Sequence, residues 1–410
     1  MERRRLKAAI GGTAAAASLA LVLAGCAAGD GGTAPTDGGS TAATFQLMDP
    51  RTGECAVAPP DGVDFAAAKE YVDQFSQPSK GIIPSVLGWD PLPEPLPAGL
   101  KIGYANNMSP VGDGLWRPFI EQAAATAGGV FVNYPAGPDP AAAATGFDAI
   151  VADPPDILIV GAIDPTLVTA QAKQLLADGV TVVWGADPRA PEILGLQDTL
   201  GGMGGSIVNG EVLAAAAVYF TCGTGTDLVW YNMPEFLFST VNHQGAEELL
   251  KQLSPNASMR SVDISIFATD NPNGIVQDLQ SHPDTQFFIT PGDQFQIGLA
   301  AAAKTAGIEN AQGIGQSSLP QNVVQIQEGT QYGGFTLDFQ QFLFQLVDEG
   351  LRKYEGVFPK DGYGTDWRRI NANISTLITQ QNVDGLDIGP DSNYYSYPNT
   401  VADYAKAWGR

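Results

Sequence analysis

Residues 155–187 read PDILIVGAIDPTLVTAQAKQLLADGVTVVWGAD, and the fold class can be predicted from this segment. Its short apolar run at 156–162 is typical of a strand that is buried on both faces of a parallel sheet. A helix is expected to follow, because Asp164 is a preferred N-cap residue, Pro165 suits the first helical position and Gly179 suits the end. A second apolar run at 180–187 completes a strand–helix–strand unit of a parallel sheet.

The same alternation extends in both directions along the chain. The segments 100–107 and 130–135 predict two earlier strands, each followed by a helical pattern. A glycine-rich break, LGGMGGS at 200–206, interrupts the pattern, which then restarts and continues to about residue 318. Two such runs predict an α/β protein with two Rossmann-like lobes, each with its own parallel sheet, joined by a hinge. A long amphipathic helix at 338–356 has no strand partner nearby, so we expect it to cover the first lobe.

The N-terminus has the features of an export signal. Residues 1–25 combine a basic start, an apolar middle and small residues at the end, as a secretory signal peptide does. A membrane span is the alternative, but glycine, serine and threonine interrupt the apolar run.

The residues Leu23-Ala24-Gly25-Cys26 resemble a bacterial lipobox, which implies cleavage before Cys26 and acylation of its thiol. An ordinary secretory signal with a chance cysteine is the other reading. Residues 26–43 predict a flexible tether, so we expect an extracytoplasmic lipoprotein anchored to the outer face of the cell membrane.

Composition excludes several classes of function. The formal net charge of −23 disfavours binding to nucleic acid, and 44% hydrophobic residues suffice for a substantial core. Beside Cys26, only Cys55 and Cys222 remain, and they form either a disulfide or two buried thiols. The two histidines are isolated, and the sequence contains no HExxH, CxxC, P-loop, GxSxG or EF-hand motif. We therefore expect no catalytic residues, no metal site and no cofactor.

Three stretches resemble the class I periplasmic binding proteins, the ribose-type sugar receptors of ABC transporters, over about residues 99–380. They are KIGYANNMSPVGDGLWRPFIEQAAATAG at 101–128, the stretch at 155–187, and HPDTQFFITPGDQFQIGLAAAAKTAGI at 282–308. The resemblance implies crossing strands near 201–206, 333–336 and 374–380, about which the lobes close on a ligand.

The resemblance also implies a division of the chain. Residues 44–98 are expected to form an N-terminal extension on the first lobe, 99–205 and 334–373 its two parts, 206–333 the second lobe, and 374–410 the last crossing and a C-terminal tail.

Candidate ligand-binding residues follow the predicted strands, because ligands bind beyond the carboxyl ends of parallel strands. They are Asn106, Asn107, Trp116, Asp164, Asp187 and Arg189 in the first run, and Asn232, Asp293, Gln294 and Gln316 in the second. Structural alternatives are an Asx-turn for the two first asparagines, a helix cap for Asp164 and core packing for Trp116.

The sequence departs from the sugar receptors at three of these places. Pro188 separates Asp187 from Arg189, Gly292 replaces the usual asparagine, and Gln316 stands where an aspartate is common. Charged groups form the stronger hydrogen bonds to a polyol, so their loss makes ribose a doubtful ligand. The aromatic run VWYNMPEFLF at 229–238 favours a bulkier or more apolar solute, with ordinary core packing as the alternative.

These observations predict a non-catalytic, monomeric receptor that passes a sugar-like or more apolar solute to an ABC permease. In Gram-positive bacteria such receptors are typically lipoproteins, and the Gly- and Ala-rich composition fits such a source. A ligand-sensing lipoprotein that serves a membrane signalling partner is the alternative, and an exported hydrolase with a carboxylate pair is a further one. The export signal excludes a cytoplasmic repressor with the same lobes.

Overall fold

The protein is represented by a computed structural model. It describes residues 44–410 except 78–79, 94–95, 110, 138, 269–270, 309–311, 386, 389–393 and 396. The predicted signal peptide, the tether and Cys26 lie outside the described residues.

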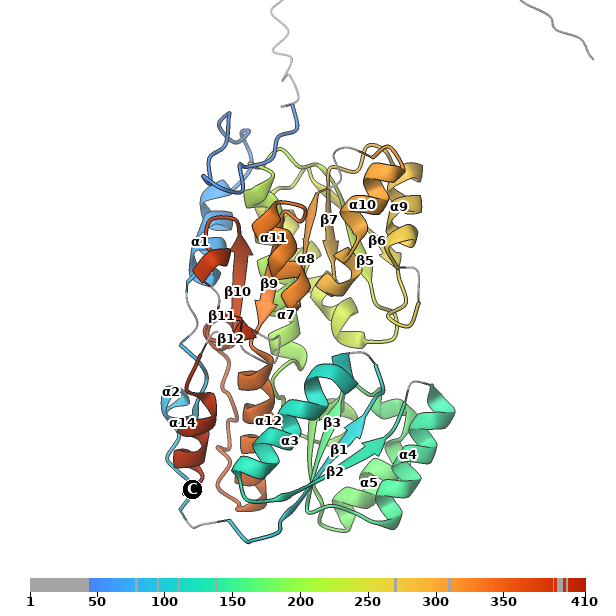
Figure 1. Cartoon of the computed structure of the whole chain (residues 1–410), viewed down its shortest axis with the longest axis vertical. Coiled ribbons are helices and arrows are strands. Elements are labelled where there is room, and N and C mark those ends of the chain that lie inside the picture. Colours follow the sequence, from blue (N-terminus) through green and yellow to red (C-terminus); the bar gives the residue numbers. More distant parts are fainter. Residues whose placement is uncertain are drawn as a thin grey trace, which may run out of the picture. The chain divides into compact units, whose positions relative to one another are not determined.

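The first lobe is a parallel sheet covered by helices on both faces (Figure 1). Its strands are β1 (Lys101–Asn106), β2 (Val130–Pro135), β3 (Ile157–Gly161) and β4 (Thr181–Gly185). Its helices are α3 (Arg117–Thr126), α4 (Pro140–Ala152), α5 (Thr169–Ala177) and α6 (Ala190–Leu194), with short turns η1 (Gly112–Trp116) and η2 (Pro165–Leu167). The strand order is β2-β1-β3-β4, and every pairing is parallel.

The second lobe repeats this topology. Its strands are β5 (Asp227–Asn232), β6 (Ser258–Asp263), β7 (Phe287–Thr290) and β8 (Gly313–Gly315). Its helices are α7 (Met203–Phe220), α8 (Leu237–Leu253), α9 (Asn271–Ser281), α10 (Leu299–Thr305) and α11 (Pro320–Glu328), with the short turn η3 (Asp293–Gln296). The order β6-β5-β7-β8 matches that of the first sheet, which confirms the predicted two-lobed α/β fold.

One strand ends earlier than its sequence suggests. Residues 260–270 predict a strand, but β6 ends at Asp263, which pairs with the last residue of β5, Asn232. Because β6 is an edge strand, it has no second neighbour to extend its ladder, and the chain turns away beyond this pair.

Strands β9 (Gly333–Leu337) and β10 (Ser375–Thr379) connect the two lobes. They pair antiparallel, and Phe335 of β9 forms a parallel bridge to Gln316 at the end of β8. Phe335 packs into the second lobe's core, while Leu337 lies against the first. The boundary expected at residue 333 therefore falls at the start of a strand that serves both lobes.

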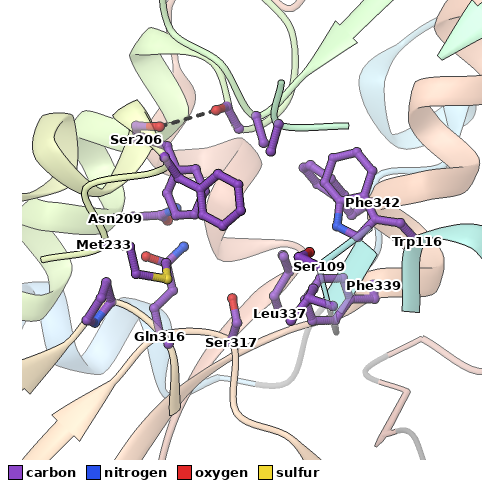
Figure 2. Close-up of a pocket in the computed structure, with 18 of the residues that line it drawn as sticks. Ser109, Trp116, Ser206, Asn209, Met233, Gln316, Ser317, Leu337, Phe339 and Phe342 are labelled. Carbon is purple, nitrogen blue, oxygen red and sulfur yellow. Dashed lines mark hydrogen bonds between the residues drawn. The ribbon is translucent and has the colours of Figure 1, made fainter. Parts of the chain in front are cut away.

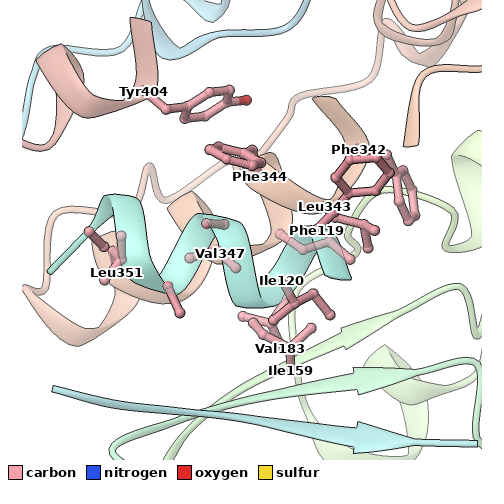
Figure 3. Packing of buried hydrophobic residues seen from close by; sticks show 14 of the residues in the cluster. Phe119, Ile120, Ile159, Val183, Phe342, Leu343, Phe344, Val347, Leu351 and Tyr404 are labelled. Atoms are coloured by element: carbon pink, nitrogen blue, oxygen red, sulfur yellow. The ribbon is translucent and has the colours of Figure 1, made fainter. Parts of the chain in front are cut away.

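Helix α12 (Phe339–Tyr354) packs on the first lobe after this crossing. Its apolar side chains Leu343 and Val347 join Ile120 of α3 and the sheet residues Ile159 and Val183 in one buried cluster (Figure 3). Asp338 caps the helix by accepting a hydrogen bond from the Gln341 backbone amide at 2.9 Å.

The sequence suggested that the N-terminal extension lies on the first lobe, but the structure places it on both lobes. Helix α1 (Phe65–Phe75) packs on α7, and its side chains Ala68 and Val72 are buried in the second lobe's core. A disulfide between Cys55 and Cys222 joins the extension to the end of α7. The chain then passes to the first lobe, where Ile82, Ile83, Leu92 and Leu96 are buried around α2 (Pro84–Leu87). The cause is the apolar face of α1, which covers the side of α7 that would otherwise face water.

The C-terminal tail lies on the first lobe. After α13 (Trp367–Ala372), β10, η4 (Val383–Gly385) and the short pair β11 (Asp387–Ile388) and β12 (Tyr394–Tyr395), helix α14 (Thr400–Ala407) contacts α3 and α12. Trp408 is fully buried there, and its indole N–H donates to Asp348 of α12 at 2.8 Å.

Helix α7 is apolar and long enough to cross a membrane, but most of it is buried inside the protein against α1 and α8. We therefore interpret α7 as the central helix of the second lobe.

Candidate ligand-binding site

Residues that follow the strands of both lobes line one cavity. It contains about 850 Å³, including the part that opens to solvent. The first lobe contributes Asn107, Ser109, Val111, Gly112, Trp116, Ala162 and Ala186; the second contributes Met233, Phe236, Phe238, Ile266, Pro291, Gly292, Gln294, Gln316 and Ser317; the connections and the helices beside them contribute Gly201, Ser206, Asn209, Leu337, Phe339, Phe342, Asn371, Ile374 and Ser375. The carboxyl ends of two parallel sheets thus meet at one site, as the topology requires.

In the first lobe, the backbone at the ends of two strands leaves space for the indole ring of Trp116. It ends η1, a π-helical turn, which is a local feature that is frequent at functional sites. Two glycines leave room for its indole: a Cβ on Gly161 would lie 3.0 Å from the Trp116 ring, and a Cβ on Gly185 would lie 3.1 Å from it. The ring is therefore seated on the ends of β3 and β4.

Aromatic and aliphatic side chains form much of the wall (Figure 2). The rings of Trp116 and Phe342 are 5.4 Å apart between centroids, at 69° to each other. In the second lobe, the rings of Phe236 and Phe238 stack with centroids 5.6 Å apart. In Figure 2, Trp116 and Phe342 lie on the opposite side of the cavity from Met233. Such rings stack on the apolar faces of ligands.

The polar lining consists of amides and hydroxyls. Asn107 donates from Nδ2 to the Gly161 carbonyl at 2.8 Å, and its Oδ1 accepts from the Ser109 amide at 2.9 Å. The amide groups of Gln316 and Asn242 hydrogen-bond at 2.6 Å. Asn371 donates to the Gly205 carbonyl and to Asn209, both at 2.9 Å. Most of these polar groups therefore bond to other groups of the protein and fix the shape of the cavity.

Three lining residues have a left-handed backbone although none is glycine. The φ angles are 50° at Ala162, 56° at Ala186 and 59° at Ser317. A non-glycine residue in this region costs of order 1–3 kcal/mol, and such strain clusters at ligand sites. Each of these residues follows a strand, so the strain is concentrated where both sheets meet the cavity.

Among the ten predicted ligand residues, Asn107, Trp116, Gln294 and Gln316 line the cavity. The others are held elsewhere. Asn106 is fully buried, and its Oδ1 accepts from the Met108 amide at 2.9 Å in an Asx-turn. Asn232 donates to Asp263 at 2.8 Å and accepts from the Ser239 hydroxyl at 2.8 Å.

The three charged ligand candidates of the first lobe form ion pairs with one another and do not line the cavity. Arg189 lies 2.9 Å from Asp164 and 3.5 Å from Asp187. Burial opposes ionisation of Asp164, but hydrogen bonds from Thr166 and the Arg189 guanidinium lower its pKa overall. Burial dominates at the nearly buried Asp187 and raises its pKa, against the effect of Arg189. Asp164 also caps η2 by accepting a hydrogen bond from the Thr166 backbone amide, which is the structural alternative to ligand binding.

Asp293 does not line the cavity, and its side chain is fully buried in the second lobe. Its side chain accepts from Gln296 Nε2 at 2.8 Å and from the Ser318 hydroxyl. Burial raises its pKa to about 7, although hydrogen bonds from Ser318, Gln331 and Gln296 act in the opposite direction.

The sequence did not indicate two of the aromatic residues in the cavity wall, Phe339 and Phe342. Phe339 and Phe342 belong to a helix that was expected only to cover the first lobe, because its amphipathic pattern does not show that its first turn reaches the cavity. By contrast, the run at 229–238 contains Met233, Phe236 and Phe238, so its composition pointed to the site.

Within the described part of the chain, no group of three or more His, Cys, Asp or Glu side chains is placed to hold a metal ion.

Comparison with known proteins agrees with this architecture. The sequence profile of the periplasmic binding protein domain matches residues 111–348. No curated protein sequence matches the chain.

Several solved structures share the fold at low sequence identity. An ABC transporter solute-binding protein from Mycobacterium smegmatis with bound glycerol has a TM-score of 0.60 at 16% identity, covering 72% of this chain and 99% of the other. A carbohydrate transporter protein from Acidothermus cellulolyticus in complex with myo-inositol has a TM-score of 0.58 at 18% identity, covering 70% and 96%. A 5-methylthioribose transporter solute-binding protein from Thermotoga lettingae has a TM-score of 0.57 at 15% identity, covering 77% and 99%. With its two matching lobes and the profile match over more than half of its length, the chain belongs to the periplasmic binding protein family.

Proposed function

We propose that this protein is an extracytoplasmic solute receptor of an ABC transporter, anchored to the membrane through Cys26, which binds a small solute between its lobes. The observation that carries the proposal is the cavity, to which the strand ends of both lobes contribute side chains. A solute held there contacts both lobes only when they are closed, so its binding energy favours the closed form.

The chemistry of the lining supports binding without catalysis. Glycoside hydrolysis requires a pair of carboxylates at the substrate. None of the described residues that line the cavity is Asp, Glu or His. Amides and hydroxyls can orient a solute, but they supply no group that titrates near neutral pH.

A thermal-shift screen tests the proposal. The full chain is heated with sugars, polyols, nucleosides and aromatic or terpenoid solutes, and its melting temperature is compared with that of the free protein. A ligand present at 100 times its Kd adds about 2.7 kcal/mol of stability, so at least one class should raise the melting temperature by several degrees. A chain that no class stabilises, or that hydrolyses glycosides, contradicts the proposal.

Uptake separates transport from sensing. Once a stabilising solute is known, deleting the gene should abolish uptake of the radiolabelled solute by the cells. Undiminished uptake would contradict the transport role and favour a signalling partner.

A further inference from the structure

We infer that the cavity takes an uncharged solute with a flat, largely apolar ring system and few hydrogen-bonding groups, rather than an unmodified sugar or polyol. The inference rests on the proposed receptor function and names the ligand class of the same site.

The first support is the absence of charge at the site. The described residues that line the cavity include no Asp, Glu, Lys, Arg or His. Of the charged groups close in sequence to the lining residues, Arg189 pairs with Asp164 and Asp187, and Arg117 pairs with Asp113. Desolvating an ionised ligand is costly unless it is paired, so a charged ligand finds no compensation here.

The second support is the small number of hydrogen-bonding groups that remain for a ligand. The amide groups of Asn107 and Asn371 already bond to backbone carbonyls, and the Ser206 hydroxyl donates to the Gly201 carbonyl at 3.2 Å. A monosaccharide carries hydroxyls around its whole edge. Each hydroxyl that is buried without a partner costs about 1–3 kcal/mol, so a polyol would lose more than it gains.

The third support is the arrangement of apolar groups on opposite sides. Trp116 and Phe342 come from the first lobe, and the nearly buried Met233 and Phe236 come from the second. In Figure 2, Gln316 lies beside Met233, on the side of the cavity opposite Trp116. A flat ring can stack against these walls while Gln316, Gln294 and Ser317 meet a few polar groups on its edge.

Three probes that differ in charge and polarity separate the ligand classes. Prodan is a neutral, planar naphthalene ketone whose fluorescence shifts to the blue in an apolar site. Naphthoate is a planar anion, and myo-inositol is a neutral polyol. The full chain is titrated with each probe, by fluorescence for prodan and by calorimetry for the other two. We expect saturable one-to-one binding of prodan and binding at least about tenfold weaker for both other probes.

Variants locate the binding. Replacing a stacking ring by alanine should weaken prodan binding about tenfold, so Phe342→Ala is the direct test. Because Phe342 is also part of the core, Phe238→Ala, whose side chain is only partly buried, is the second. Phe267→Ala is the matched control, since Phe267 is 38% exposed and does not line the cavity.

The outcomes separate the inferred ligand class from the proposed receptor function. Tight binding of myo-inositol with weak binding of prodan overturns the ligand class but leaves the receptor function standing. Prodan affinity that is unchanged by both Phe342→Ala and Phe238→Ala overturns the assignment to this cavity. If neither prodan nor myo-inositol binds one-to-one and the thermal-shift screen is also negative, both the ligand class and the receptor function fail.

Discussion

Asp293 follows a strand of the second lobe, yet its side chain does not line the cavity. The sequence resemblance implied a ligand contact, but the carboxyl is fully buried and bonded to Ser318 and Gln296. Its neighbour Gln294 lines the cavity instead. Strand ends are identifiable from sequence, whereas the direction of each side chain in the following turn depends on local hydrogen bonds that a pattern of residue types does not contain.

The buried carboxyl of Asp293 predicts a pH dependence of stability. Its pKa is raised to about 7 by burial, above a value of about 3.9 in the unfolded chain. The folded protein therefore keeps a proton that the unfolded chain loses, and the contribution of this group to stability declines as pH rises from about 4 to about 7. The free energy of unfolding of the wild type, relative to that of Asp293→Asn, should fall by a few kcal/mol between pH 5 and pH 7.

Urea denaturation at a series of pH values measures this difference. Asp284→Asn, at an exposed position on the same lobe, serves as control and should track the wild type. A difference between wild type and Asp293→Asn that is constant with pH would show that the carboxyl is not protonated in the folded state.

At the scale of elements, the strands and helices of both lobes were predictable because their periodicities differ. Strand β2 spans Val130–Pro135, as its apolar run predicts, and Asp164 and Pro165 begin the turn after β3. The placement of α1 was not predictable. An amphipathic helix indicates that one face is covered, but not by which lobe, since the apolar surfaces of α7 and of the first lobe are equally suitable partners.

The disulfide adds a covalent link to the apolar contacts that hold α1 and its preceding segment on the second lobe. It links residues 167 apart in sequence, so its removal frees a long loop of the unfolded chain. The double variant Cys55→Ser with Cys222→Ser should lose about 2–4 kcal/mol of unfolding free energy. Hydrogen exchange should increase around Met48 and Phe75, which pack in the second lobe's core, and remain unchanged in α14.

Equal protection of the extension in the wild type and in the double variant would contradict this role. It would mean that the apolar contacts of α1 suffice to hold the segment without the bond.

For the whole molecule, composition and chain order indicated the architecture, because two βα runs separated by a glycine-rich break favour two sheets over one long sheet. The ligand was not predictable to the same degree. The aromatic wall is assembled from α12, from the loop after β5 and from η1, which are far apart in sequence. Only the fold brings Phe342, Phe236 and Trp116 to one cavity.

The proposed membrane anchoring through Cys26 has its own test. If the lipobox-like residues at 23–26 are processed, Cys26→Ser should release the protein from the membrane fraction into the medium, because the acyl chains supply the binding energy. Immunoblots of the two fractions measure this, with Cys55→Ser as a control that retains the anchor. Equal membrane retention of Cys26→Ser would show that another segment holds the protein.

A mutant cycle across the cavity tests whether a solute is held by both lobes at once. The Kd of the tightest-binding probe is measured for the wild type, Trp116→Ala in the first lobe, Phe238→Ala in the second, and the double variant. Each single change should weaken binding about tenfold, and the double variant should bind more weakly than either single variant. A probe whose affinity depends on only one of the two residues is bound by a single lobe, and that result would contradict the account.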